Sequence, residues 1–397
     1  MLLNGALILI ALVAGALLLW PRLSGAKLWQ ATITPLASII GSGFLVLGPI
    51  LNDAYGYYAP LVMAALCATA YLFGWAIRYN IAAIETDESR TALETRLERI
   101  ASWVLSFAYV ISVSYYLNLF GAFGVSLTPF DGPDNARLLT TAMLLLILCV
   151  GWLWGFKALE RMEQVSVGIK LAVIAALLAG LAWYFYDRTT AGALQINPPG
   201  KTGWNGIALA FGLIVTVQGF ETARYLGSTY EPRIRIRAMR LSQWLSAAIY
   251  MIYIVLLSYV FRAGQFKLDE TAIIDMMAVV APVLPGLLVL AALSAQFSAA
   301  VADTSGAGGL MEEESGGRIP QRFAYLALVT IGILLTWVFN VFEIVSYASR
   351  AFALYYAIQS AIAAAAAQRR SHRVRAVTFL ALALLGTAIF VFGQPAE

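Results

Sequence analysis

The sequence predicts an all-α polytopic membrane protein with about twelve transmembrane helices. Of its 397 residues, 61% are hydrophobic and only 12% are charged, and the mean hydropathy is +0.78. The apolar residues fall in long runs, and a run of roughly 20 residues at a rise of 1.5 Å each is enough to cross a bilayer. Short polar loops separate these runs, and basic residues gather in every second loop, which is typical of polytopic membrane proteins.

Each predicted span is an apolar run of about membrane length. The spans lie at residues 3–20, 28–52, 57–80, 101–125, 138–155, 163–186, 204–228, 240–261, 284–310, 324–340, 343–364 and 376–393. The first span has no basic residues before it, and it ends at Trp20, Pro21 and Arg22 rather than at a small-residue cleavage site. We therefore expect a retained helix there, with a signal peptide as the alternative.

The longest predicted loop, residues 81–100, carries acidic and basic residues at helical spacing. Thr86, Asp87 or Ser89 could cap an amphipathic helix that lies along the inner membrane surface. A solvated connector is the alternative. Neither this loop nor any other is long enough to form a separate soluble domain.

The distribution of Lys and Arg sets the predicted orientation, because cytoplasmic loops carry an excess of both. The loops on the side with fewer basic residues hold only Arg137, Arg188, Lys201, Arg262 and Lys267. Both termini are therefore predicted to face outward, and we expect an integral protein of a bacterial inner membrane. The pI near 9.0 reflects the basic loops, so the expected surroundings are a lipid bilayer and not nucleic acid.

Two of the predicted spans contain residues that disfavour a continuous helix. The first, SIIGSGFLVLGPIL at residues 38–51, includes Gly41, Gly43 and Pro49. Glycine costs about 1 kcal/mol and proline about 3 kcal/mol relative to alanine inside a helix. The second, at residues 211–232, has Gly219 close to Glu221, whose charge is expensive at membrane depth. Each stretch predicts either a broken helix around a binding site or close packing through small residues.

The spacing of these two stretches predicts an inverted repeat. If the first span is set aside, they belong to helices 1 and 6 of a ten-helix core, and an odd number of spans per half gives the halves opposite orientations. We therefore divide the chain into four parts. They are an extra N-terminal helix and loop at 1–27, a first repeat at 28–186, a second repeat at 187–366 and a C-terminal helix at 367–397.

The inventory of reactive residues argues against an enzyme. Cys67 and Cys149 lie within predicted spans, and His372, the one histidine, lies in a basic loop. These residues provide neither a metal-ligand cluster nor a nucleophile with a base, so we expect no catalysis and no cofactor beyond a coupling Na⁺ or H⁺.

Several motifs give the chain a family resemblance. IIGSGF at 39–44, and VQGFET at 217–222 followed by TYEPRIRIRAM at 229–239, are similar to motifs of the first and sixth core helices in the amino acid-polyamine-organocation (APC) superfamily. VSVGIKL at 165–171 and GGRIP at 316–320 add weaker similarities to the fifth helix and to the loop after the eighth. The chain resembles these permeases over roughly residues 28 to 364. This implies the LeuT-type five-plus-five inverted-repeat fold, with core helices 1 and 6 broken.

The resemblance also implies where substrate binds. Exposed backbone in helices 1 and 6 would hold it, which in this sequence means Gly41, Ser42, Gly43, Thr216, Val217, Gln218 and Gly219. Aromatic side chains would shape the rest of the pocket, for which the candidates are Phe220, Tyr109, Tyr115, Tyr116 and Tyr347.

The predicted coupling residues lie on helices 5 and 8 of the core, and sodium symporters bind their ion between helices 1 and 8. Lys170 sits within a span, and some members of the family place this lysine where sodium symporters bind an ion; snorkelling to the interface is the alternative. The eighth helix supplies oxygen ligands from Ser298, Asp303, Thr304 and Ser305, with a possible sodium ion at Thr304 and Ser305. The sequence leaves sodium and proton open.

Three further charged residues are predicted at membrane depth. They are Glu221, Arg224 and Arg350. Because an isolated charge is expensive there, we favour a salt bridge from Arg350 to Glu221, Asp303 or Glu343 over a role as a gate or an anion contact.

We therefore predict a secondary active transporter of a small organic solute, in the first place an amino acid or a related amine. Alternating access around the two helix breaks would carry the substrate, and an ion or proton gradient would drive it. One alternative is a carrier for another solute, such as a nucleobase, an organic anion or an inorganic ion. The other is a membrane sensor that keeps the fold without transporting.

Overall fold

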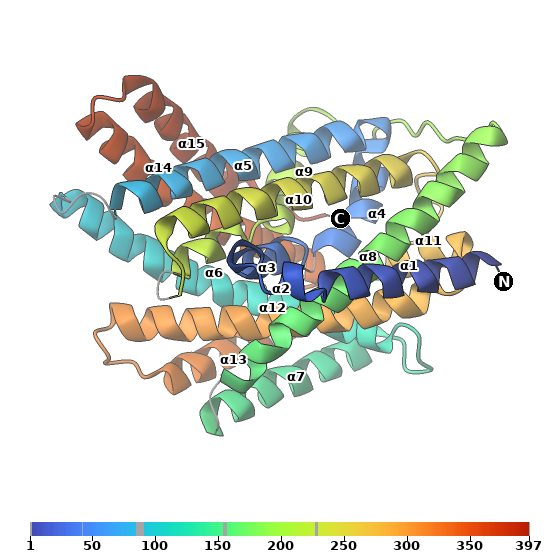
Figure 1. Ribbon diagram of the computed structural model, residues 1–397, viewed down its shortest axis with the longest axis horizontal. Coiled ribbons are helices and arrows are strands. Elements are labelled where there is room, and N and C mark those ends of the chain that lie inside the picture. The colour runs from blue at the N-terminus through green and yellow to red at the C-terminus, as the bar shows by residue number, and fades with distance from the viewer. Residues whose placement is uncertain (1, 42, 85–90, 154–156, 227–228, 397) are drawn as a thin grey trace.

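The computed structural model describes residues 2–41, 43–84, 91–153, 157–226 and 229–396. The predicted site residue Ser42 and the predicted caps Thr86, Asp87 and Ser89 lie outside this part of the chain. Within it, the regular elements are helices, so the all-α class predicted from the sequence is confirmed (Figure 1).

The helices follow one another with short connections. In chain order they are α1 (Leu2–Leu18), α2 (Pro21–Ser24), α3 (Lys27–Ile39), α4 (Gly43–Tyr55), η1 (Gly56–Tyr58), α5 (Ala59–Ile84), α6 (Ala92–Val125), α7 (Pro133–Leu153), α8 (Lys157–Thr190), α9 (Gly203–Gly212), η2 (Ile214–Val217), η3 (Phe220–Tyr225), α10 (Pro232–Ser258), α11 (Ala272–Val280), α12 (Leu284–Glu314), α13 (Gln321–Val338), α14 (Val341–Arg369) and α15 (Arg373–Phe392). The three η elements are short 3-10 helices.

The protein is an integral membrane protein. By length and composition, eight helices in the described part of the chain can cross a membrane, and α1 is a shorter apolar helix. In Figure 1 the long helices run roughly along the long axis of the molecule, with connections at its two ends. We call the end with the α5–α6, α12–α13 and α14–α15 connections the basic end. The end with the N-terminus and the α8–α9 connection is the opposite end.

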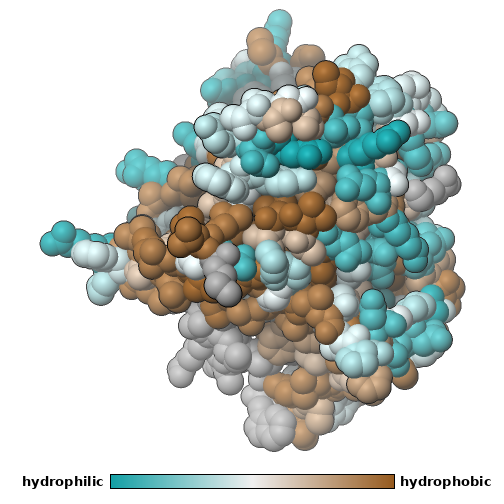
Figure 2. Space-filling model, turned by 90° about the vertical axis from the view of Figure 1, so that its right-hand side faces the viewer, coloured by the Kyte–Doolittle hydropathy of each residue, from teal (hydrophilic) through white to brown (hydrophobic). Residues whose placement is uncertain are grey.

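The opposite end is seen face on in Figure 2. Hydrophilic residues cover much of this surface, with hydrophobic residues between them, as expected where helices end in polar loops. Residues 259–280 of this end include α11, an apolar helix of nine residues that lies between two of the predicted spans. It is too short to give a membrane-span signal.

The prediction for residues 81–100 is wrong in one respect. Residues 92–100 are the first turns of α6, which runs without interruption to Val125, and they do not form a separate helix along the surface. Thr91 begins this helix with a capping box. Its hydroxyl accepts from the Glu94 amide, and the Glu94 carboxylate accepts from the Thr91 amide. The helix therefore extends about 14 Å beyond the predicted span at the basic end.

Both predicted helix breaks are present. α3 ends at Ile39 and α4 begins at Gly43, so the first core helix is in two pieces. The sixth is also divided: α9 ends at Gly212, η2 follows, and the backbone then runs through an extended Gln218 and a Gly219 with a φ of 116° before η3 begins. Such a φ is strained for any residue with a Cβ, which explains a glycine there.

The broken helices lie inside the bundle, where irregular backbone is tolerated at membrane depth. α3 packs against α8, α10 and η3, whereas α4 contacts η2. The long helix α6 packs against α12 and α14. Of these two, α12 also contacts α3 and α14 also contacts η2. The fold therefore surrounds two short stretches of non-helical backbone with five long helices.

Candidate functional site

The two helix breaks are in direct contact with each other. A Cβ atom at Gly43 would lie 2.6 Å from both Cα and Cβ of Thr216, so only glycine permits this approach between the first and sixth helices. A Cβ atom at Gly219 would lie 2.6 Å from the carbonyl carbon of Ser38, in the last turn of α3. Each of the two broken helices thus places a glycine in contact with the backbone of the other.

The last four carbonyl groups of α3 need partners, because no following turn of helix supplies them. Two are satisfied by the chain that follows: the Ile40 amide donates to Leu36 O at 3.0 Å and the Gly41 amide to Ser38 O at 3.2 Å. The other two, of Ala37 and Ile39, accept from side chains of other helices.

Lys170 and Tyr250 are those two side chains. Lys170, on α8 and only 3% exposed, donates from Nζ to Ala37 O at 2.6 Å. The Tyr250 hydroxyl, from α10, lies 3.0 Å from Ile39 O and 2.5 Å from Thr216 O. Lys170 thus places a positive charge at the negative end of the α3 dipole, and Tyr250 links the carbonyl groups of both breaks.

Ser349 on α14 satisfies the backbone at the start of the second break. Its hydroxyl donates to Gly212 O at 2.6 Å and accepts from the Val215 amide at 3.0 Å. The Thr216 hydroxyl turns back to Leu213 O at 2.6 Å. The Gly212 carbonyl and the Val215 amide, on either side of Leu213, therefore both bond to one serine side chain where α9 ends.

Gln218 and Glu221 are the polar side chains at the second break, and both are buried. Gln218 donates from Nε2 to the Tyr116 hydroxyl at 3.0 Å. Glu221 Oε2 accepts from the Gly219 amide at 3.0 Å and from the Tyr356 hydroxyl at 2.9 Å. Among the described residues, the remaining oxygens, Gln218 Oε1 and Glu221 Oε1, are buried without a hydrogen-bond partner. Within the described part of the chain, two acceptors are thus left without a donor.

Aromatic rings enclose this region. Tyr356 stacks on Phe220 with their ring centroids 5.1 Å apart, and it stacks on Phe73 at the same distance. Tyr109 meets the edge of Phe352 at 5.9 Å and also lies close to Gly306 on α12. The walls around the break are therefore largely apolar, which raises the cost of leaving Gln218 and Glu221 incompletely hydrogen-bonded.

The predicted coupling residues of α12 are in two different environments. Asp303 is buried and accepts a hydrogen bond from the Ser112 hydroxyl of α6. The buried Thr304 hydroxyl donates to Ala300 O of its own helix at 2.7 Å. Ser298 and Ser305 are half-buried. Within the described residues, no group of three or more His, Cys, Asp or Glu side chains is arranged to hold a metal ion.

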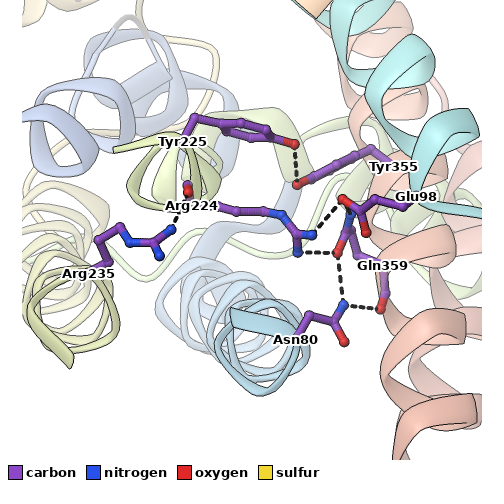
Figure 3. Close-up of polar contacts among 7 residues, drawn as sticks. All are labelled: Asn80, Glu98, Arg224, Tyr225, Arg235, Tyr355 and Gln359. Carbon is purple, nitrogen blue, oxygen red and sulfur yellow. Dashed lines mark hydrogen bonds and ion pairs between the residues drawn. The ribbon is translucent and has the colours of Figure 1, made fainter. Parts of the chain in front are cut away.

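Arg224, at the end of η3, forms a buried polar network at the basic end (Figure 3). Its Nη2 lies 2.5 Å from Glu98 Oε1, and its Nη1 donates to Gln359 Oε1 at 2.7 Å. Asn80 Nδ2 donates to the same Gln359 oxygen at 2.8 Å, and Arg235 donates to the Arg224 carbonyl at 2.7 Å. Residues of α5, α6, α10 and α14 therefore hold the second half of the broken sixth helix.

Arg350 does not form the salt bridge that the sequence favoured. Glu221, Asp303 and Glu343 are all described, and none is an ion-pair partner of Arg350. The Arg350 Nε instead donates to Phe390 O on α15 at 2.7 Å, and the guanidinium lies 5.8 Å from the centre of the Phe390 ring. Arg350 therefore faces away from the breaks, toward α15.

The structure brings most of the predicted substrate residues together. Gly43, Thr216, Gly219, Gln218, Tyr116, Phe220 and Glu221 lie at or beside the contact between the breaks, with Gly41 and Val217 buried next to them. Tyr115 packs beside Tyr116, while Tyr347 lies elsewhere, in a cavity with Arg350. Residues that the sequence analysis missed are Ser38, Glu98, Tyr250, Ser349, Tyr356 and Gln359. Single serines, tyrosines and glutamines in apolar helices gave no motif by which to find them.

Comparison with known proteins places the chain among transporters. The sequence model of a family described as APC superfamily transporter matches residues 21–393. An uncharacterised protein of Aquifex aeolicus (strain VF5) is 41% identical over 384 residues, which cover 95% of this chain and 93% of that protein. The crystal structure of a mutant manganese transporter of Eremococcus coleocola has a TM-score of 0.58, covering 94% of this chain and 90% of that chain. At 15% identity, this last likeness is one of fold alone.

The contact between the breaks predicts that Gly43→Ala and Gly219→Ala both lower stability. The first adds a Cβ where backbone already lies at 2.6 Å, and the second forces an unfavourable φ, so each should cost about 1–3 kcal/mol. Gly168→Ala is the control, since nothing lies within 4 Å of its Cβ position on α8. Thermal unfolding of the purified variants measures the effect. A melting temperature for both glycine variants equal to that of the control would contradict the close approach.

Proposed function

The chain belongs to the APC superfamily of transporters, and on that premise we propose that it is a secondary active transporter of a small organic solute that bears an amino group, such as an amino acid. Its family and its fold are those of transporters and not of enzymes. The substrate would bind where the two helix breaks meet. Alternating access would then expose this point first at one end of the bundle and then at the other.

The proposal of an amine substrate depends on two buried acceptors at the second break that have no hydrogen-bond partner, Gln218 Oε1 and Glu221 Oε1. A buried acceptor without a donor costs about 1–3 kcal/mol, and more when it is charged. A ligand ammonium brings N–H donors and a positive charge, so it would satisfy both groups. A neutral or anionic ligand without donors would leave Glu221 as a buried carboxylate with one oxygen unpaired.

The first break suits the carboxylate of an amino acid. The first amides of a helix have no intrahelical acceptor and carry a partial positive charge, so the start of α4 at Gly43 favours an anionic group. This start faces Thr216 of the second break. An α-amino acid would therefore have a helix N-terminus for its carboxylate and Glu221 on the side of its ammonium.

The alternative carriers receive less support from the site. An organic anion would need positive charge at membrane depth, for which the candidates are Arg224 and Arg350. Arg224 is paired with Glu98, and Arg350 turns toward α15. The acidic groups Glu221 and Asp303 are the buried charges that remain near the breaks, together with Lys170. A membrane sensor with the same fold would bind the same ligand without moving it.

We further propose that Lys170 couples transport to protons. Its ammonium satisfies Ala37 O at the end of α3, a position at which the resemblance to sodium symporters places an ion between helices 1 and 8. The lysine can supply or remove that charge by gaining or losing a proton, because a buried lysine shifts its pKa readily. In the sodium alternative, Thr304 and Ser305 would be ligands, although the Thr304 hydrogen already points to Ala300 O.

The network around Arg224 would be the closure at the basic end. Arg224 joins η3 to α6 through Glu98 and to α14 through Gln359, so an opening of the bundle between these elements would break the network. By the positive-inside rule this end faces the cytoplasm, so both termini would lie outside and the membrane would be a bacterial inner membrane. With this network intact, the structure would represent a state that is shut toward the cytoplasm.

The amine proposal predicts that Gln218→Ala reduces uptake of the substrate by about tenfold, through a weaker KM, because it removes one acceptor worth about 1.4 kcal/mol. Uptake of radiolabelled amino acids into proteoliposomes identifies the substrate and measures the effect. Gln265→Ala, on an exposed loop of the opposite end, is the control and should transport normally. Transport of solutes that lack an amino group, with no uptake of amines, would refute this substrate class.

The coupling proposal predicts that uptake responds to a pH gradient and is indifferent to sodium. Lys170→Gln keeps an N–H donor for Ala37 O but does not titrate, so its uptake should lose the pH response while binding persists. Lys267→Gln, an exposed lysine of the opposite end, should behave like the unmodified protein. A strict sodium requirement, with an unchanged pH profile in Lys170→Gln, would contradict proton coupling through Lys170 and favour a sodium site at Thr304 and Ser305.

The closure proposal predicts charge-swap rescue. Glu98→Arg and Arg224→Glu should each abolish uptake, because either leaves a buried charge opposite its like, and breaking a buried pair costs about 3–5 kcal/mol. The double variant restores an opposite pair and should recover uptake and thermal stability. The more exposed pair Arg99 and Glu314, 3.8 Å apart, provides the control, since its swap should cost under about 1 kcal/mol. Equal effects at both pairs would contradict a special role for Arg224.

A further inference from the structure

A cavity lies at the opposite end of the bundle, separate from the helix breaks. Its volume is about 370 Å³, within the range of small-ligand pockets. Trp204 of α9 forms one wall, α14 contributes Glu343, Ser346, Tyr347 and Arg350, and residues 391–395 at the end of α15 close the third side. None of these residues touches the contact between Gly43 and Thr216.

Arg350 is the basic residue among those that line this cavity. It lies about 14 Å along the helix axis from the start of α14, so it is well below the end of that helix. A guanidinium has five N–H donors, and the structure shows an acceptor for Nε, the carbonyl of Phe390. Among the described residues, no acceptor and no carboxylate engages the planar fork of Nη1 and Nη2. An arginine at such depth normally has an anionic partner.

Glu343 does not fill that role, although it lines the same cavity. Its carboxylate accepts from the Asn340 amide at 2.8 Å and its amide donates to the Asn340 side chain, which fixes Glu343 in the first turn of α14. Seven residues, or two helical turns, separate it from Arg350. The Glu343 carboxylate therefore caps α14, and Nη1 and Nη2 of Arg350 are available to a ligand.

The lining of the cavity combines aromatic rings with polar side chains, and the cavity is partly open. Trp204 and Phe392 meet edge to face with their ring centroids 5.2 Å apart, and both are about half exposed. Tyr347 packs on Phe339 on the other side. A ligand that reaches Arg350 would therefore pass between aromatic side chains. Glu343, Ser346 and Gln394 are polar residues of the same lining.

We propose that this cavity binds an oxyanion carried on an apolar body, with the carboxylate or phosphate held by the guanidinium fork of Arg350. A planar fork matches the two oxygens of such a group in a bidentate pair. The apolar body would lie between Trp204, Tyr347 and Phe392. Both an organic carboxylate from solution and the headgroup of an anionic lipid have this chemistry.

The cavity is connected to the second helix break. Arg350 directly follows Ser349, whose hydroxyl holds Gly212 and Val215. On the opposite wall, the Gln394 amide donates to Ala208 O of α9 at 2.9 Å, and a Cβ atom at Gly212 would collide with Gln394 O. An anion that joins α14 to the end of α15 therefore restrains α9, and the site does not require that the protein transport anything.

The test is ligand-dependent thermal stability of the purified full chain in detergent, with sodium benzoate as one probe and phosphatidylglycerol as the other. Sodium chloride at equal ionic strength and phosphatidylcholine are the respective references. We expect a saturable rise in melting temperature with at least one probe, since a ligand at 100 times its Kd stabilises by about 2.7 kcal/mol. The probe that acts identifies the source of the anion.

Variants assign the effect to Arg350. Arg350→Gln should lose the shift, whereas Arg262→Gln, at an exposed arginine of the same end, should keep it. Ser346→Glu places a carboxylate one turn before Arg350, so it should raise the melting temperature without ligand and abolish the response to both probes. No shift in the unmodified protein with either probe, or an undiminished shift in both Arg350→Gln and Ser346→Glu, would overturn the proposal.

Discussion

The constraint on which the site depends is that backbone groups freed by a helix break need hydrogen-bond partners when no water is at hand. Two breaks occur side by side in this bundle, and side chains from three other helices complete them. Lys170 of α8 holds the end of α3, Tyr250 of α10 bridges both breaks, and Ser349 of α14 binds both sides of Leu213. The irregular backbone is therefore a specified conformation, fixed by the helices around it.

The hydrogen bonds at the breaks also support the proposed position of the ligand. The carbonyl groups at the end of α3 and the backbone groups on either side of Leu213 have partners within the protein, whereas one oxygen each of Gln218 and Glu221 is buried without one. Unsatisfied acceptors in an apolar enclosure are costly, and proteins keep them where a ligand or a proton completes them. In the proposed function, the amino group of the substrate would complete them, and protonation of the buried Lys170 would change the local charge.

The second break also lies between two other features of the fold. Toward the basic end, η3 is tied down through Arg224 and its network. Toward the opposite end, α9 touches the wall of the Arg350 cavity through Ala208 and Gly212. A change at either end would therefore act on the sixth helix, whose two halves are joined only by a non-helical segment around Gly219. Ion pairs and packed helices with two discrete arrangements are the usual elements of such transitions.

The sequence by itself determined the membrane class, the positions of the long helices and both breaks, because apolar length, glycine and proline act locally along the chain. It also identified Gly43, Gly219, Gln218, Glu221 and Lys170 as unusual for their surroundings. Only the tertiary structure decided their partners. That Tyr250 reaches two carbonyl groups, that Arg224 pairs with Glu98, and that Arg350 turns to Phe390 instead of a carboxylate all depend on how helices far apart in sequence pack. Side-chain polarity shows that a partner is needed, but the helix that supplies it is fixed by the geometry of the bundle.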